Sequence, residues 1–158
     1  MSETVLQASA VVIGGRALLI EGPPGSGKSS LALALVDRGA GLIGDDAVTL
    51  TAKGGSLIAS PPPHIEGLLE VRGVGLVTLP VAPPAQVALI ITLGGPTPQR
   101  LPETPLPRRI INGVAVPVLG FDPGTIAPAP RAEWALAMHG LDIKPASLCC
   151  PDAPDDSA

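Results

Sequence analysis

A glycine-rich stretch near the start of the chain constrains the fold more than any other feature. The residues Gly22-Pro23-Pro24-Gly25-Ser26-Gly27-Lys28-Ser29 fit the phosphate-binding pattern G-x-x-x-x-G-K-[ST]. The apolar run 17–20 before this stretch predicts a buried strand, and the residues 29–36 after it are good helix formers. Backbone N–H groups of such a turn surround an anion at the positive end of the following helix. The pattern predicts a nucleotide-phosphate site; the alternative is a surface turn rich in glycine and proline.

Length and charge narrow the class of protein. The 158 residues suffice for one domain, expected over residues 1–144, and the Pro-, Asp-, Ala- and Ser-rich residues 145–158 are expected to be a disordered tail. A net charge of −4 argues against a general binder of nucleic acid or anionic membranes. The apolar runs fall short of the about 20 residues that a membrane span needs, and no secretory signal is visible. Adjacent Cys149 and Cys150 are expected to be free thiols in the cytoplasm.

The rest of the chain predicts mainly short strands separated by turns. Hairpin turns are expected at Gly14-Gly15, Gly54-Gly55 and Asn112-Gly113. The mainly apolar run 86–93 predicts a central strand, and the proline-rich residues 94–107 predict a loop. Further expected elements are strands over 4–13, 16–21, 42–43, 47–52, 56–60 and the later part of 70–79, a helical turn over 64–69, a helix ending near Arg38, and a helix over 128–140 with Trp134, Leu136 and Met138 available for packing.

A nucleotide site also needs carboxylates, and the best candidates follow a short apolar strand, in Gly44-Asp45-Asp46. In a P-loop fold the strand ends lie on the same rim as the loop, where carboxylates can hold Mg²⁺ or take a proton from an acceptor. Adjacent carboxylates also repel each other, which favours proton uptake by one of them. The alternative is a solvated turn, for which Gly-Asp-Asp is equally suited.

Glu70 and Arg72 are a second candidate pair. On a strand they would share one face at positions i and i+2, where Glu70 could hold a metal and Arg72 could clamp a phosphate. The alternative is a salt bridge at the rim of the fold. Arg100 lies within the predicted loop 94–107, and taken alone it indicates only a solvated charge.

Together these motifs resemble the catalytic domain of bacterial HPr kinase/phosphorylase over residues 5–140. The matching elements, in order, are the glycine-rich stretch, Asp45-Asp46, Leu69-Glu70-Val71-Arg72-Gly73-Val74-Gly75-Leu76, and Arg100-Leu101. The resemblance implies an α/β P-loop domain with a mixed, strand-rich sheet and few helices, similar to phosphoenolpyruvate carboxykinase. It implies ATP-dependent phosphorylation of a serine of the phosphocarrier protein HPr, with phosphorolysis as the reverse step. Because the resemblance covers only the catalytic domain, we expect the short α-proteobacterial form, without the family's usual N-terminal domain. The expected partners of that form are phosphotransferase-system proteins that regulate metabolism and do not import sugar.

The resemblance also implies which residues bind the cofactors, ATP and Mg²⁺. Residues 22–29 with Ser30 would bind the nucleotide, and Lys28 would contact its β- and γ-phosphates. Ser29 and Glu70 would hold Mg²⁺.

The same comparison implies the catalytic residues. Asp46 would be the general base in phosphorylation and the general acid in dephosphorylation, with support from Asp45. Arg100 would stabilise charge on the transferring phosphoryl group. Because the family often forms hexamers, the resemblance also implies a homo-oligomer.

Three positions depart from the family pattern. Gln7 stands where a histidine is usual, and Ser30 stands where an acidic residue is usual. The segment 121–124, tied to the phosphorolysis direction, has no arginine until Arg131. Since glutamine cannot carry a proton or a positive charge, a catalytically weak or inactive nucleotide-binding regulatory module is the alternative function. A kinase of the nucleoside-monophosphate type is a third hypothesis, ranked last because the loop 94–107 carries one arginine where a lid needs several.

Overall fold

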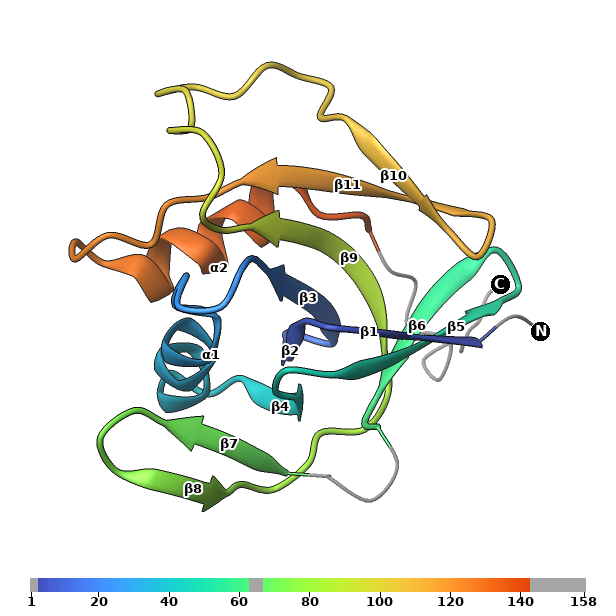
Figure 1. Ribbon diagram of the computed structural model, residues 1–158. Helices are drawn as coiled ribbons and strands as arrows, with labels where there is room; N and C mark the ends of the chain where they lie inside the picture. The colour runs from blue at the N-terminus through green and yellow to red at the C-terminus, as the bar shows by residue number, and fades with distance from the viewer. Residues whose placement is uncertain (1–2, 63–66, 143–158) are drawn as a thin grey trace, which may run out of the picture.

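The computed structural model of the protein describes residues 3–62 and 67–142 (Figure 1). This part of the chain contains eleven strands and two helices, neither of them long and apolar enough to cross a membrane. In chain order the elements are β1 (Glu3–Leu6), β2 (Ser9–Ile13), β3 (Arg16–Glu21), α1 (Lys28–Asp37), β4 (Gly41–Gly44), β5 (Val48–Lys53), β6 (Ser56–Ser60), β7 (Leu68–Val71), β8 (Gly75–Thr78), β9 (Ala85–Thr92), β10 (Arg108–Ile111), β11 (Val114–Gly120) and α2 (Pro128–His139).

Most of the strands belong to one mixed sheet in the order β1-β5-β6-β9-β3-β2-β4, with the β10–β11 hairpin joined to β9. β9 is its centre, because one edge pairs with β3 and the other pairs first with β6 and then with β11. β3 and β11 are parallel to β9. β4 runs in the same direction, since it is antiparallel to β2, which is antiparallel to β3. The carboxyl ends of β3, β4, β9 and β11 therefore lie at one rim of the sheet.

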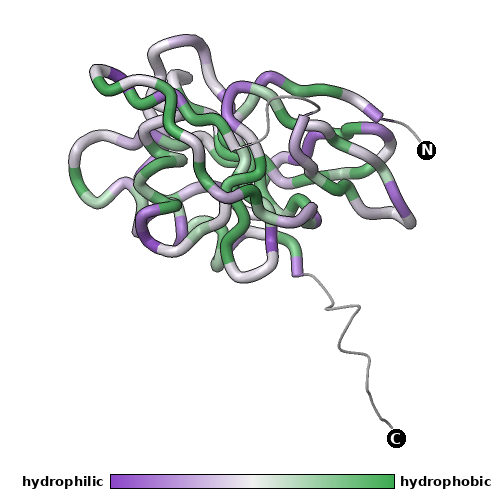
Figure 2. Tube along the Cα trace, turned by 90° about the horizontal axis from the view of Figure 1, so that it is seen from below, coloured by the Kyte–Doolittle hydropathy of each residue, from purple (hydrophilic) through white to green (hydrophobic). Residues whose placement is uncertain are grey.

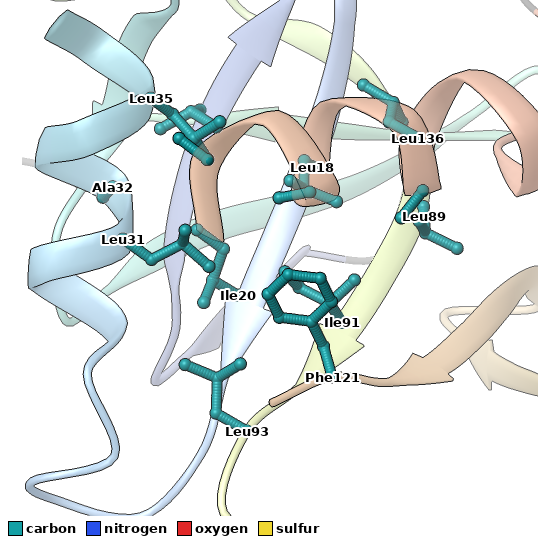
Figure 3. Packing of buried hydrophobic residues seen from close by; sticks show 14 of the residues in the cluster. Leu18, Ile20, Leu31, Ala32, Leu35, Leu89, Ile91, Leu93, Phe121 and Leu136 are labelled. Atoms are coloured by element: carbon teal, nitrogen blue, oxygen red, sulfur yellow. The ribbon is translucent and has the colours of Figure 1, made fainter. Parts of the chain in front are cut away.

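Hydrophobic side chains cover both faces of the central strands. Leu89 and Ile91 of β9 pack in one cluster with both helices, and Figure 3 shows Leu35 of α1 and Leu136 of α2 in that cluster. Ile90 packs in a second cluster, which is formed mainly by strands of the same mixed sheet. A strand buried on both faces has no polar alternation, which explains the uninterrupted apolar run 87–91 within β9. Figure 2 shows hydrophobic stretches running through the body of the molecule, and both hydrophilic and hydrophobic stretches at its periphery.

Several sequence expectations are confirmed. The structure has the mixed, strand-rich sheet with few helices, the central strand β9, and the three glycine-containing hairpin turns. Residues 94–107 form a loop without helix or regular strand, and both helices occupy their expected positions.

The single strand expected over residues 4–13 is wrong. The chain forms two strands, of which β1 pairs with β5 and β2 pairs with β3 and β4. The break falls at Gln7 and Ala8, where the chain moves from one part of the sheet to another and Ala8 becomes fully buried. Because no glycine or proline stands there, the local sequence does not signal the break.

Residues 70–79 also differ from the expectation of a polar start followed by one strand. β7 and β8 form a separate two-stranded hairpin, in which Glu70 pairs with Leu76. Gly73 adopts φ 81°, a conformation that glycine allows easily, and it closes the turn. Arg72 therefore lies in the turn and does not share a strand face with Glu70.

The packing expected of α2 is confirmed for one residue of three. Leu136 is 1% exposed, whereas Trp134 is 67% and Met138 is 71% exposed. The helical turn expected over 64–69 lies partly outside the described residues, and its described end begins β7. Cys149, Cys150 and the tail over 145–158 lie wholly outside the described residues.

Candidate functional site

Four connections leave the rim at which the parallel strands end. The glycine-rich loop joins β3 to α1, Asp45 and Asp46 follow β4, the loop 94–107 follows β9, and residues 121–127 follow β11. These connections touch one another closely. A Cβ atom added to Gly94 would lie 2.9 Å from Pro23 Cδ, and one added to Gly27 would lie 3.9 Å from Pro123 Cγ. The topology therefore gathers segments that are distant in sequence around the glycine-rich loop.

The glycine-rich loop has the geometry of an anion site. Gly27 precedes α1 with φ 100°, a left-handed conformation that glycine adopts at no steric cost. No side-chain hydrogen bond caps α1 among the described residues, so the N–H groups of its first turn remain for a ligand. The Ser26 hydroxyl is buried and has no hydrogen-bond partner in the described chain. Phosphate oxygens would satisfy the N–H groups of this first turn, and the loop therefore fits a phosphate.

Lys28 lies at the mouth of this loop, as its sequence position predicts. Its Nζ donates a hydrogen bond of 2.8 Å to the carbonyl of Gly22, so the ammonium is held beside the anion site. A fixed positive charge at the amino end of a helix strengthens binding of a polyphosphate.

Asp45 connects three separate elements. Its Oδ1 accepts hydrogen bonds from Ser29 Oγ of α1 at 2.7 Å and from Ser9 Oγ of β2 at 2.9 Å. Its Oδ2 accepts from the backbone N–H of Glu70 in β7 at 3.2 Å. The next residue, Asp46, adopts φ 69°, a left-handed conformation that costs a non-glycine residue about 1 kcal/mol.

A cavity of about 680 Å³ opens over the loop and these carboxylates. Its lining consists of Gln7, Gly22, Pro24, Gly25, Gly27, Lys28, Ser29, Ser30, Asp45, Asp46, Glu70 and Arg72. The cavity thus brings together the predicted phosphate-binding, carboxylate and metal-binding residues. Pro23 and Ser26 belong to the same loop without lining the cavity, and Arg100 lies apart from it on the exposed loop 94–107.

The residues at this cavity fit Mg²⁺ as a bound ion. Ser29, Asp45 and Glu70 supply hydroxyl and carboxylate oxygens, the ligand type that Mg²⁺ prefers. Within residues 3–62 and 67–142, no three His, Cys, Asp or Glu side chains form a metal-binding group. Mg²⁺ in proteins is usually bound by few carboxylates, and substrate phosphates and water molecules complete its coordination sphere. The salt bridge between Glu70 and Arg72, given above as the alternative for this pair, is not among the ion pairs of the described chain.

An ion pair behind the loop was not predicted from the sequence. Glu21, the last residue of β3, accepts a hydrogen bond of 2.8 Å from Arg109 Nη1 of β10 and forms an ion pair with Arg109 Nη2. Hydrogen bonding to Glu21 raises the pKa of Arg109, against a smaller opposing effect of burial. The pair ties the β10–β11 hairpin to the strand that leads into the glycine-rich loop. Its members are far apart in sequence, so no local signal could have identified it.

Comparison with known proteins decides the family. Residues 1–92 match the family model described as "HPr Serine kinase C-terminal domain". The chain belongs to this family. An HPr kinase/phosphorylase from Ralstonia pickettii is 34% identical over 144 residues, which cover 81% of this chain and 44% of that protein. One from Clostridium botulinum (strain Eklund 17B / Type B) is 47% identical over 75 residues, which cover 48% of this chain and 25% of that protein.

A solved structure supports the fold of the HPr serine kinase C-terminal domain. The Hpr(Ser) kinase/phosphatase from Coxiella burnetii superimposes with a TM-score of 0.74 at 29% identity, covering 86% of this chain and 95% of that one. The expected fold class is therefore confirmed. The matched segments span less than half the length of the Ralstonia and Clostridium relatives.

The structure also shows where this member of the HPr serine kinase C-terminal domain family departs from the expected pattern. Gln7 and Ser30 both line the cavity, so these two substitutions lie at the candidate site itself. Arg131 of α2 reaches back to the segment 121–124, with its guanidinium 4.9 Å from the centre of the Phe121 ring. Its Nη2 donates 2.8 Å to the Asp122 carbonyl. Arg131 thus braces its own loop and does not line the cavity with Lys28.

Proposed function

We propose that this protein is an ATP- and Mg²⁺-dependent protein-serine kinase that phosphorylates an HPr-like phosphocarrier protein of a regulatory phosphotransferase system in the cytoplasm. Residues 1–144 would form the catalytic unit. The observation that carries the proposal is the 2.7 Å hydrogen bond from Ser29 to Asp45, which joins the phosphate-binding loop to the carboxylate pair at one cavity. Family membership supports the kinase activity and the HPr-like substrate.

In this proposal the loop binds and orients ATP. Backbone N–H groups of Gly25, Gly27 and the first turn of α1 would surround the phosphates, and Lys28 would neutralise charge on the β- and γ-phosphates. Ser29 and Glu70 would hold Mg²⁺, and the ion would supply further neutralisation of the phosphate charge. Asp45 fixes the Ser29 hydroxyl.

The transfer step needs a base for the acceptor. The oxygen of the acceptor serine forms a bond to the γ-phosphorus, and Asp46 takes the proton of that hydroxyl. At the same time the bond from the γ-phosphorus to the ADP oxygen breaks. The products are phosphoserine and ADP. Arg100 is proposed to stabilise charge on the transferring group, from a loop whose first residue, Gly94, lies against Pro23. In the reverse direction Asp46 would act as general acid.

The test is phosphoserine formation on a purified HPr-like protein incubated with the enzyme, ATP and Mg²⁺, measured by mass spectrometry. The proposal predicts one phosphorylated serine, whose appearance requires both ATP and Mg²⁺. ADP binding without phosphoserine formation would favour the regulatory module suggested by Gln7 and Ser30. A hexamer, implied by the family, would show as a mass in solution about six times the 15.8 kDa of the chain.

A further inference from the structure

Ser9 is a buried polar residue within an otherwise apolar strand. It is the first residue of β2 and is 0% exposed, and Thr49 is the other buried polar residue of the described chain. Burying a hydroxyl costs free energy unless it finds a hydrogen-bond partner. Ser9 has such a partner, because its Oγ donates to Asp45 Oδ1 at 2.9 Å.

The register of the sheet explains this contact. Ala10 of β2 pairs with Gly44, the last residue of β4. Because these strands are antiparallel, the preceding residue Ser9 faces the residue that follows Gly44, which is Asp45. The carboxylate of Asp45 therefore leaves β4 already facing a donor on the neighbouring strand.

Asp45 in turn determines the orientation of the Ser29 hydroxyl. Both Ser9 and Ser29 donate to the same oxygen, Oδ1, from β2 and from α1. With its proton directed at Asp45, Ser29 keeps its oxygen lone pairs for a ligand. A hydroxyl that binds a cation needs this orientation, and outer hydrogen bonds of this kind usually fix it.

We infer that Ser9 is a positioning residue for the metal side of the site. It holds Asp45 so that the Ser29 oxygen stays available to Mg²⁺. Ser9 acts through Asp45 and is not itself a catalytic residue. The inference rests on the proposed function for the identity of the ligand, Mg²⁺ with a nucleotide.

The test compares the affinity for a fluorescent ADP in Mg²⁺ and in EDTA. Ser9→Ala removes the hydroxyl, and Ser9→Thr retains one. Thr49→Val is the matched control, because the Thr49 hydroxyl is also buried but has no hydrogen-bond partner in the described chain. We expect Ser9→Ala to bind roughly five- to tenfold more weakly in Mg²⁺ and unchanged in EDTA. Ser9→Thr and Thr49→Val should bind the fluorescent ADP with wild-type affinity both in Mg²⁺ and in EDTA.

Three results would overturn the inference while leaving the proposed function intact. The first is wild-type affinity of Ser9→Ala in Mg²⁺. The second is an equal loss of affinity with and without Mg²⁺, which indicates general damage to the loop. The third is an equal loss in Ser9→Ala and Ser9→Thr, which means that the hydroxyl is not what matters. If Ser9→Ala does not fold, Ser9→Cys replaces it, with a smaller Mg²⁺-specific loss expected. A wild type that binds no ADP in either condition contradicts the proposed function itself.

Discussion

Asp45 and Asp46 are neighbours in the sequence but have different surroundings. Asp45 accepts three hydrogen bonds, whereas Asp46 accepts none among the described residues and is held in a left-handed conformation at the cavity. Strained backbone of this kind is concentrated at functional sites. The arrangement supports a division of roles at the residue scale, in which Asp45 holds Ser29 and Asp46 is left to accept a proton.

Gly22 offers a residue-scale test of the loop. A Cβ atom at this position would lie 2.5 Å from Ser26 Oγ and 2.9 Å from the Leu93 carbonyl, so Gly22→Ala must displace the loop. We expect Gly22→Ala to weaken ADP binding at least about tenfold, since the backbone N–H groups lose their alignment. Gly95→Ala is the control, because a Cβ there meets nothing within 4 Å. Equal ADP affinity of the two variants in a fluorescence titration would contradict this view of the loop.

The sequence indicates some site residues and conceals others. The glycine-rich loop, Asp45 and Asp46 follow patterns whose chemistry is local, so their positions could be predicted. Ser9 could not, since its contact depends on the register between β2 and β4. Arg131 could not either, because only the folded position of α2 brings its guanidinium back over Phe121.

At the element scale, Arg131 fixes the connection between β11 and α2. It donates to the carbonyls of Asp122 and Ile126 and stacks over Phe121, while Pro123 of the same connection lies against Gly27. The connection therefore packs against one side of the glycine-rich loop.

Arg131→Gln should weaken the packing of this connection against the glycine-rich loop. We expect a loss of about 1–2 kcal/mol in the free energy of unfolding, from lost hydrogen bonds and the cation–π contact, together with weaker ADP binding. Arg108→Gln is the control, because Arg108 is exposed on β10 and its side chain has no hydrogen bond in the described chain. Denaturant unfolding and ADP titration of both variants check the prediction, which fails if Arg131→Gln behaves like Arg108→Gln.

The two faces of α2 should respond differently to truncation. Leu136 is buried among residues of β3, β9 and α1, so Leu136→Ala is expected to cost about 2–5 kcal/mol of stability. Trp134 is mostly exposed, and Trp134→Ala should change stability by less than about 1 kcal/mol. Chemical denaturation of the two variants measures the difference. A similar cost for both would mean that α2 packs on the sheet through another face.

Element boundaries could be predicted where turn residues mark them. Gly14-Gly15, Gly54-Gly55 and Asn112-Gly113 each close a hairpin as expected. The break at Gln7 and Ala8 carries no such mark, because long-range pairing with two different strands produces it. The β7–β8 turn could not be predicted for another reason, because its glycines stand within a run that also suits a strand.

For the whole molecule, parallel strands explain how one site is built from distant segments. The carboxyl ends of β3, β4, β9 and β11 lie at one rim, which is where open α/β sheets bind ligands. The sequence predicted the mixed, strand-rich fold through its resemblance to a family and through the motif order. It could not predict that the loop carrying Arg100 would lie outside the cavity, since loop positions depend on packing that local patterns do not encode.

The most direct test of the account is the rate of phosphoserine formation by wild type and Asp46→Asn, with ADP affinity measured alongside. If Asp46 is the base, Asp46→Asn should bind ADP within about twofold of wild type but transfer phosphate roughly 10²- to 10⁴-fold more slowly. Equal transfer rates for the two proteins, or no phosphoserine from the wild type with ATP, Mg²⁺ and its HPr-like partner, would contradict the account.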